Sequence, residues 1–434
     1  MDKSVVPPRA PLGLPIAWWV SIGTAIGLSL GFSAVASTVF GQFVPSLSQA
    51  FGWSRAQTTL AVSFSNIPLL IMAPVFGILI DRLGAWRTLL VSQIVLPLIL
   101  MSLATLQGSL TQLYISFFLI ALLGAGTLPA AYTRIILTWF DRRRGVGLGV
   151  ALSGVGVAAL VLPPLTQAAI SGFGWRAALV AISALFLIAG LVNVMTLMRI
   201  QPRSPEEIDG GAVASGEVAA DPDSGTPWQA ALRAPTYWLI ALAFVPLGLA
   251  SMGLLVNLPS ILVDRGWSGS AAASMISLLG ATLIFARLIT GWFLDHTRTI
   301  YVVAVIFGCP VFGFLLLAGA ETVPITALAV FLIAFGIGAE FDVMAFLLSR
   351  FFGPVSYGRL YGGVYASYNV GVAVGPVYLA HQFDALGSYS DALTLFAGLF
   401  LASGLLLTWV ARKLSRPTLR LWEPQTQAAP TTTP

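Results

Sequence analysis

The chain has 434 residues, of which 57% are hydrophobic and only 9% are charged, and its formal net charge is +5. Soluble domains carry about 25% charged residues, so this composition excludes a soluble fold and places most of the chain in a lipid bilayer. A membrane-spanning helix needs roughly 20 apolar residues. The length therefore allows twelve spanning helices joined by short turns, and we expect an all-α membrane protein.

Twelve apolar segments follow one another along the chain. In the first half the predicted helices cover residues 16–40, 54–80, 88–107, 110–140, 145–170 and 175–198. In the second half they cover residues 237–263, 270–294, 300–320, 324–352, 358–383 and 390–411. The first segment is too long for a signal-peptide core and lacks a cleavage pattern, so we expect it to be a retained helix.

Polar segments divide this pattern into two halves. Residues 1–15 are polar and Pro-rich, and residues 199–235 mix Pro, Gly and acidic residues in a composition that cannot bury a core. We predict a flexible linker at 199–235, six-helix bundles at 16–198 and 236–411, and tails at 1–15 and 412–434.

The basic residues predict the orientation. If the N-terminus lies in the cytoplasm, only Arg55, Arg176 and Arg265 fall outside, and the other basic residues of the turns and tails fall inside. Such a bias is typical of multi-pass membrane proteins. An even number of helices then places the C-terminus in the cytoplasm as well. We predict a multi-pass protein of the cell (inner) membrane.

A charged turn after the second predicted helix recurs at half-chain distance. The first copy contains Gly77, Asp81, Arg82, Gly84 and Arg87. The weaker second copy, after the eighth predicted helix, contains Gly291, Asp295 and Arg298. Gly145 and Gly358 form another pair at nearly the same separation. Repeated halves around a central cavity are typical of secondary transporters.

These features resemble the major facilitator superfamily over nearly the whole chain. The first charged turn matches the signature that follows the second helix of that family. The resemblance implies twelve transmembrane helices in two pseudo-symmetric six-helix bundles that rock about a central site. It also implies that Asp81 and the basic residues after it latch the cytoplasmic helix ends, with Asp295 and Arg298 as the counterpart.

Three further motifs resemble the monocarboxylate porter and oxalate–formate antiporter branch. They are the run 139–145 (WFDRRRG), the run 174–176 (GWR) and the run 285–287 (FAR). The resemblance implies that Arg287 binds the carboxylate of the substrate. This chain departs from the branch at Leu283, where animal members carry Asp, and it lacks their Lys in the first helix and the Lys of the oxalate exchangers in the eleventh. The resemblance therefore supplies an anion site but no proton site.

Four ionisable residues lie well inside predicted helices: Arg134, Arg287, Glu340 and Asp342. A charge at the bilayer centre costs about 2.5–3.5 kcal/mol, so these residues must face a wet cavity or one another. Arg287 either offers its planar guanidinium to a carboxylate or forms a structural ion pair with Glu340 or Asp342. Arg134 either makes a second anion contact or extends toward the cytoplasmic surface.

Glu340 and Asp342 are two residues apart, so they point about 200° apart around a helix. Only one is expected to face the cavity, where a carboxylate that loses its solvent can carry a proton. The other is expected to lock the bundle. We favour Glu340 as the proton carrier because Gly336, one turn earlier, leaves it room to move. Pairing of either residue with Arg287 is the alternative.

Tyr361, Tyr365 and Tyr368 share one helical face, with Asn369 beside them. This row either stacks on an aromatic or planar solute or packs against a neighbouring helix. Tyr132 and Asn257 are further candidates for lining the cavity, and helix–helix hydrogen bonds are their alternative role.

No phosphate-binding loop and no nucleophile–base arrangement is evident in the sequence. Its two histidines, His296 and His381, lie near predicted helix ends, so we expect no metal site. We also expect no cofactor, no enzymatic activity and no nucleic-acid partner.

We expect a monomer in the lipid bilayer that takes up a small organic anion with protons by alternating access. A monocarboxylate, including an aromatic one, is the preferred class. The alternatives are an efflux antiporter for drugs or metabolites and a non-transporting membrane sensor. Residues 161–164 lack the Gly-Pro ending of the drug-antiporter signature, which disfavours the efflux alternative.

Overall fold

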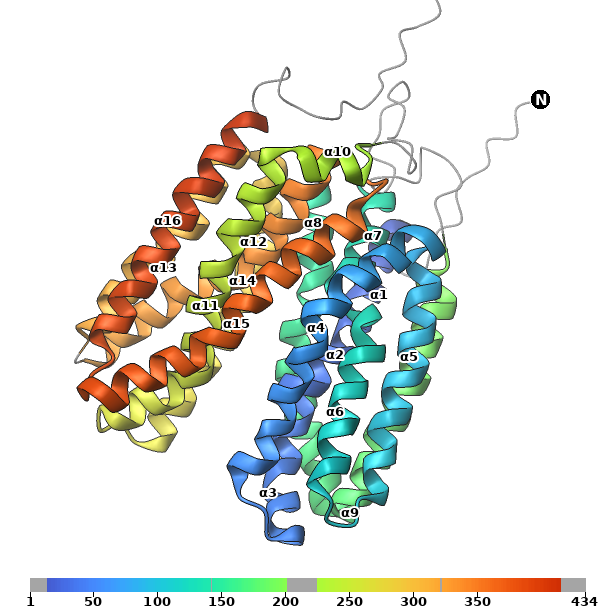
Figure 1. The fold of residues 1–434 in the computed structure, drawn as a ribbon, viewed down its shortest axis with the longest axis vertical. Coiled ribbons are helices and arrows are strands. Elements are labelled where there is room, and N and C mark those ends of the chain that lie inside the picture. The colour runs from blue at the N-terminus through green and yellow to red at the C-terminus, as the bar shows by residue number, and fades with distance from the viewer. Residues whose placement is uncertain (1–13, 142, 201–224, 321, 415–434) are drawn as a thin grey trace, which may run out of the picture.

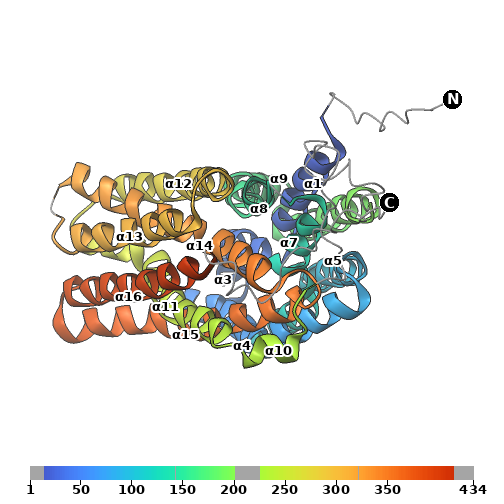
Figure 2. The ribbon, with the colours of Figure 1, turned by 90° about the horizontal axis from the view of Figure 1, so that it is seen from above.

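The computed structural model describes residues 14–141, 143–200, 225–320 and 322–414, and every regular element in these ranges is a helix. Most of the predicted linker and both predicted tails lie outside the described residues. The helices form two bundles that meet at one end and diverge at the other (Figure 1). We call these the closed end and the open end. Seen from above, the bundles lie side by side (Figure 2).

Within the described residues, the first bundle comprises nine α-helices and two short π-helices. They are α1 (Ile16–Ser29), α2 (Phe32–Ala34), η2 (Val35–Val39), α3 (Phe40–Phe51), α4 (Arg55–Leu83), α5 (Ala85–Ser102), α6 (Leu110–Gly124), α7 (Pro129–Trp139), α8 (Arg144–Leu152), α9 (Gly154–Asn193) and η5 (Val194–Met198), with the short turns η3 (Leu103–Thr105) and η4 (Ala125–Thr127). The second bundle comprises α11 (Pro235–Asp264), α12 (Gly269–His296), α13 (Thr299–Ala318), α14 (Val323–Phe352), α15 (Tyr357–Leu386) and α16 (Ser390–Leu414).

The described residues contain ten segments that are long and apolar enough to cross a membrane. One of them, Arg144–Met198, has 55 residues and makes two crossings, because Gly174 adopts φ 77° and turns the chain. Helix α15 adds a further crossing of 30 residues, although its Tyr and Gly residues lower its hydropathy. These crossings confirm the predicted fold of twelve helices in two bundles.

The first and fourth crossings differ from the single helices predicted at 16–40 and 110–140. The first is interrupted at Gly31 and continues as far as Phe51, and the fourth is interrupted between Gly124 and Pro129. The two breaks meet, since the backbone N–H of Phe32 donates to the Thr127 hydroxyl at 2.8 Å. This bond satisfies a backbone group that the break would otherwise leave unpaired inside the membrane.

The end of the predicted linker forms a short helix that contacts the second bundle. Helix α10 (Trp228–Arg233) follows Thr226, whose N–H donates to the Phe352 carbonyl at 2.8 Å. The Arg359 guanidinium lies over the Trp228 ring, 5.5 Å from its centroid. An indole that packs under a cation gives this short segment a fixed place on the second bundle.

At the closed end the bundles approach at two related crossings, α4 with α15 and α8 with α12. Gly77 faces Gly358 in the first, and Gly145 faces Gly291 in the second. A Cβ atom on any of these glycines would collide with the carbonyl oxygen of its partner glycine. Small residues allow two helix backbones to approach this closely, so the repeated glycines of the sequence are contact points between the bundles.

Candidate functional site

Arg287 on α12 and Asp342 on α14 form an ion pair inside the second bundle. The Arg287 Nη1 atom lies 3.2 Å from Asp342 Oδ2, Arg287 is 7% exposed and Asp342 is fully buried. Asp342 Oδ1 has no hydrogen-bond partner among the described residues. The ion pair expected as an alternative for Arg287 is therefore formed, and one carboxylate oxygen of the pair is left without a donor.

Glu340, also fully buried, makes a separate set of contacts. Tyr368 of α15 donates its hydroxyl to Glu340 Oε1 at 2.8 Å, and Ser251 of α11 donates to Oε2 at 3.1 Å. Both carboxylate oxygens are thus occupied by neutral donors. The spacing of Glu340 and Asp342 placed them on different sides of α14, and the structure gives them different partners.

The tyrosines of α15 form a row. Ring centroids are 5.6 Å apart between Tyr357 and Tyr361, 6.4 Å between Tyr361 and Tyr365, and 6.3 Å between Tyr365 and Tyr368. Phe341 of α14 joins this row, 5.8 Å from Tyr365 and 4.9 Å from Tyr368. The sequence reasoning missed Phe341, although its position between two intramembrane acids could have indicated it.

The tyrosine row lies next to both the ion pair and the first bundle. Tyr361 is close enough to Arg287 and Asp342 for its hydroxyl to interact with their charges, and that hydroxyl has no hydrogen-bond partner among the described residues. Tyr361 and Tyr365 also line a small apolar cavity at the first bundle. The other lining residues are Ala73, Phe76, Ile80, Ala125, Leu128, Ala130 and Gly362. The row therefore connects the buried cation to the surface between the bundles.

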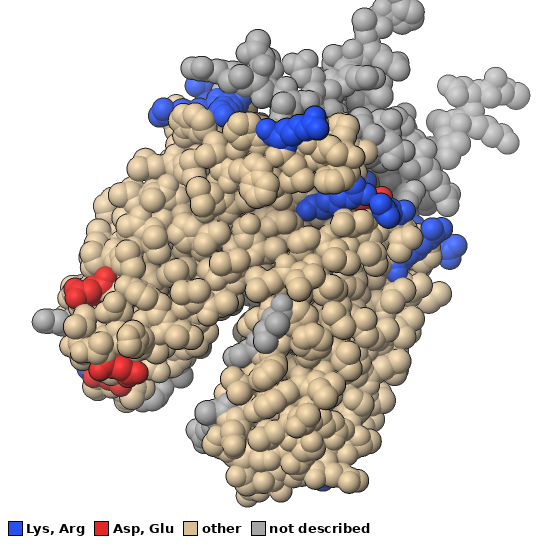
Figure 3. Space-filling view, in the orientation of Figure 1, with Lys and Arg blue, Asp and Glu red and all other residues tan. Residues whose placement is uncertain are grey.

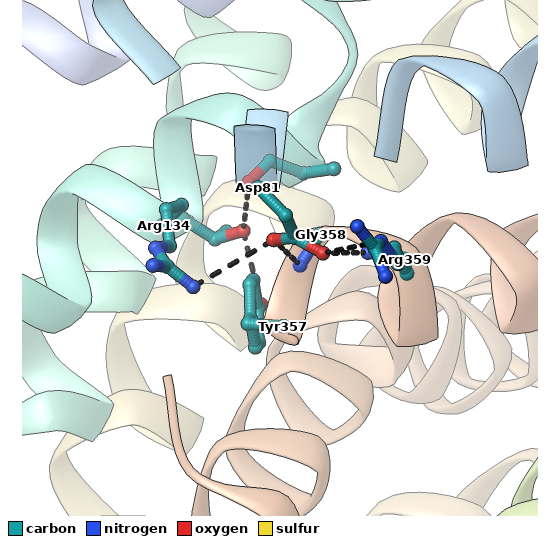
Figure 4. A network of polar contacts seen from close by, with 7 residues as sticks. Asp81, Arg134, Tyr357, Gly358 and Arg359 are labelled. Carbon is teal, nitrogen blue, oxygen red and sulfur yellow. Dashed lines mark hydrogen bonds and ion pairs between the residues drawn. The ribbon is translucent and has the colours of Figure 1, made fainter. Parts of the chain in front are cut away.

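Asp81 at the end of α4 binds the first turn of α15 (Figure 4). Its two carboxylate oxygens accept from the backbone N–H groups of Gly358 at 2.9 Å and Arg359 at 3.0 Å. The side chains of Arg359 and Arg134 add ion pairs at 3.6 and 3.7 Å. A helix N-terminus carries unpaired N–H donors and partial positive charge, so it binds a carboxylate well. Arg134, predicted to contact an anion or extend to the surface, is thus part of this contact.

Tyr357 adds a further bond across the same contact, because its hydroxyl donates to Thr133 of α7 at 3.0 Å (Figure 4).

Asp295 repeats the arrangement of Asp81 at the other crossing. It accepts from the N–H groups of Gly145 at 2.6 Å and Val146 at 2.8 Å, at the start of α8. Each charged turn of the sequence repeat therefore caps a helix of the opposite bundle.

A further contact between the bundles involves two residues that the sequence analysis does not single out. Arg350 of α14 donates to the carbonyl oxygen of Asp141 at 2.9 Å, and its side chain lies 3.7 Å from the Asp141 carboxylate. Arg350 and Asp141 carry opposite charges and lie at predicted helix ends in different halves of the chain. These two properties are the only indication of the contact in the sequence.

Several predicted latch residues lie outside these contacts. The side chains of Arg82, Arg87 and Arg298 form no hydrogen bond or ion pair with any residue that the structure describes. Gly84 adopts φ 87° and makes the turn between α4 and α5, a conformation that favours glycine.

Three predicted lining residues contact their own bundle. Tyr132 is fully buried against Gly27 of α1. Asn257 donates to the carbonyl oxygens of Gly253 and Pro376, at 2.9 and 3.2 Å, and Asn369 donates to the carbonyl of Tyr365 at 2.8 Å. Asn257 thus makes the helix–helix bond that was its alternative role. Across the described residues, no three His, Cys, Asp or Glu side chains are placed to hold a metal ion.

Known transporters are similar to this chain in sequence and fold. The family model of the Major Facilitator Superfamily matches residues 26–376. Monocarboxylate transporter 13 of Rattus norvegicus is 26% identical over 400 residues, which cover 90% of this chain and 88% of that protein. Monocarboxylate transporter 12 of Homo sapiens is 24% identical over 411 residues, 86% of this chain and 79% of that protein.

Solved structures agree with the fold. The E. coli fucose:proton symporter FucP has a TM-score of 0.69 at 16% identity, with 93% of this chain and 100% of that chain covered. The human organic anion transporter MFSD10 has a TM-score of 0.67 at 17% identity, with 90% and 98% covered. With the two repeated bundles, the paired capping carboxylates and the family match over most of its length, the chain belongs to the Major Facilitator Superfamily and is related to the monocarboxylate transporters.

Proposed function

We propose that this transporter takes up a small organic anion together with protons. The observation that carries the proposal is Arg287, a buried guanidinium beside the surface between the bundles, with Asp342 as its only ion-pair partner in the described chain. A buried arginine can offer two parallel N–H donors to a carboxylate, and this geometry selects carboxylate ligands. The names of the relatives, monocarboxylate transporters, support the same class of solute.

The residues near Arg287 favour a planar apolar body on the solute. Tyr361 and Tyr365 present aromatic rings to the surface between the bundles, and the Tyr361 hydroxyl adds a donor. Aromatic rings stack on flat groups, so a monocarboxylate with an aromatic or unsaturated body is the preferred class. Arg134, Tyr132, Asn257 and Asn369 are more distant candidates, because the structure engages them in other contacts or buries them in their bundles.

Proton coupling follows from the charge on Asp342. A second carboxylate that entered beside Arg287 would place two negative charges near one buried cation, which is costly in a low-dielectric site. A proton on Asp342 removes this conflict and releases Arg287 for the solute. Proton binding and anion binding then favour one another, as in any coupling between two sites. Glu340 is the second candidate, since it is buried beside Tyr368 and thus close to the same tyrosine row.

We assign the closed end to the cytoplasm. Lys and Arg side chains of the visible face gather at this end, and acidic side chains appear at the open end of the second bundle (Figure 3). The positive-inside rule gives this orientation. The structure then corresponds to the outward-facing state, in which Asp81 and Asp295 hold the cytoplasmic ends together. Rocking of the bundles breaks both capping contacts and opens the site to the cytoplasm.

The test is uptake into proteoliposomes with an imposed pH gradient, acid outside, and labelled monocarboxylates of increasing aromatic character. We expect accumulation above the external concentration that a protonophore abolishes. An efflux antiporter would instead require a gradient of the opposite sign, and a sensor would move no solute in either direction. Absence of gradient-driven uptake across the whole carboxylate panel contradicts the proposal.

A further inference from the structure

Two arginines share one indole ring at the closed end of the first bundle. The guanidinium carbon of Arg87 lies 5.8 Å from the centroid of Trp86, and that of Arg199 lies 5.7 Å from the same centroid. Trp86 and Arg87 open α5, and Arg199 directly follows η5, so two helix ends bring them together. We call Trp86, Arg87 and Arg199 the Trp86 cluster.

The charge of this cluster is not balanced by the described protein. Both arginines are exposed, and neither side chain forms a hydrogen bond or ion pair with a described residue. Arg82, exposed at the end of α4, adds a third cation near the same turn. Both guanidinium groups lie near one ring, and an anion with several oxygen atoms can accept from the paired donors of each.

The surface beside the cluster is apolar. Val91 lies four residues after Arg87 on α5 and is 61% exposed, and Met195 lies four residues before Arg199 and is 58% exposed. Residues four apart share a helix face, so each arginine has an exposed apolar side chain one turn deeper in the membrane. Helix α5 packs against α9 and η5, so the two apolar side chains lie on neighbouring segments. The cluster thus combines cations at the membrane surface with an apolar strip below them.

We propose that the Trp86 cluster binds the phosphate of an anionic glycerophospholipid, with the acyl chains along Val91 and Met195. The two guanidiniums hold the phosphate oxygens, and the Trp86 indole fixes both side chains through cation–π contacts. Basic groups at the end of membrane helices attract anionic lipids in this way. The apolar strip selects a lipid over a free phosphate ion. This site is independent of the transported solute and of Arg287.

Native mass spectrometry of the purified full-length protein, titrated with phosphatidylglycerol, tests the proposal. We expect the tightest-bound lipid to be held about tenfold more weakly in the R87Q/R199Q variant. The matched control is R412Q/K413Q, which removes the same charge from the end of α16, where Lys413 lies 4.1 Å from the Trp409 ring centroid. This control should hold the tightest lipid as the parent does. Equally weakened lipid binding in both variants shows that the lipid is attracted by diffuse charge, and it overturns the proposed site at the Trp86 cluster.

A second pair of measurements separates a lipid from a free phosphate. The V91S/M195S variant keeps every charge, and we expect it to lose affinity for phosphatidylglycerol as well. Inorganic phosphate at equal concentration should displace little of the lipid from the parent. Unchanged affinity in V91S/M195S, or efficient displacement by inorganic phosphate, overturns the assignment to a lipid. Arg87, Arg199, Val91 and Met195 are all exposed, so we expect unchanged melting temperatures, which confirm that the two test variants are folded.

Discussion

Under the proposed function, the Arg287 side chain has both a structural role and a role in binding the solute. It neutralises the buried Asp342, and under the proposed function it must also leave that partner to bind a solute carboxylate. Truncating one member of a buried ion pair costs about 3–5 kcal/mol, because the other charge is left unpaired. A substitution that keeps the charge is therefore the informative one.

Arg287→Lys keeps a cation beside Asp342 but loses the planar fork that binds a carboxylate through two donors. We expect anion affinity to fall about 10- to 100-fold, which corresponds to the loss of one charge-assisted hydrogen bond. The melting temperature should change little. Equilibrium binding of a labelled monocarboxylate measures the effect. The R287Q/D342N double variant is the control, since it removes both charges and should be stable but unable to bind. Normal binding by either protein refutes the anion site.

A pair of amide variants distinguishes the roles of the two buried carboxylates, Asp342 and Glu340. Under the proposed function, the ion pair with Arg287 favours Asp342 as the proton carrier, whereas the sequence favours Glu340. Asp342→Asn should abolish accumulation driven by a pH gradient yet keep exchange of solute at equal concentrations on both sides. Glu340→Gln can still bond to Tyr368 and Ser251, so we expect it to keep gradient-driven accumulation. The reverse pattern assigns the proton to Glu340, and accumulation by both variants excludes both residues.

At the scale of the elements, the closed end depends on helices that cross at glycine. The crossings of α4 with α15 and of α8 with α12 each bring two glycines face to face and add one aspartate that caps the opposite helix. Such contacts form only in the conformation in which these ends meet. They therefore stabilise that state relative to the one with the ends apart.

Gly291→Ala should disfavour the closed end, because the added methyl group collides with the Gly145 carbonyl. We expect the open ends to move closer together, since the bundles rock as rigid bodies. Spin labels at Ser171 and Ser388, exposed near the open ends of the two bundles, report this distance. Gly280→Ala on the same helix is the matched control, because its methyl group meets no atom within 4 Å. A label distance in Gly291→Ala equal to that in Gly280→Ala contradicts this account of the crossing.

At the scale of the whole molecule, the uneven distribution of charge predicts which end faces the cytoplasm. Thr297 is exposed in the turn after α12 at the closed end, and Ser388 is exposed between α15 and α16 at the open end. The single native cysteine, Cys309, lies within α13 and can be replaced by serine to give a background without thiols. Single cysteines at these two positions therefore form a matched pair.

In intact cells, we expect an impermeant thiol reagent to label Ser388→Cys and to leave Thr297→Cys unlabelled. Both cysteines should react once the membrane is made permeable, which confirms that each side chain is accessible. Labelling of Thr297→Cys in intact cells would reverse the orientation. It would also mean that the structure faces inward rather than outward, so this measurement fixes the direction of the proposed transport cycle.

The sequence by itself determined the features that repeat or persist along the chain. Apolar stretches of sufficient length predicted the twelve crossings, and the recurrence of the Asp81 turn at Asp295 predicted two related halves. The cost of a bare charge in the membrane predicted that Arg287 faces either a wet cavity or another charged residue. These inferences need only local composition, spacing and the properties of the bilayer.

The tertiary structure decided which residues meet. It paired Arg287 with Asp342 rather than Glu340, placed Arg134 on Asp81, added Phe341 to the tyrosine row and broke the first and fourth crossings where Phe32 bonds to Thr127. Each step along a helix rotates a side chain by about 100°, so partners depend on the rotation and depth of every helix relative to its neighbours. Packing between distant segments sets those quantities, and one sequence read locally does not contain them.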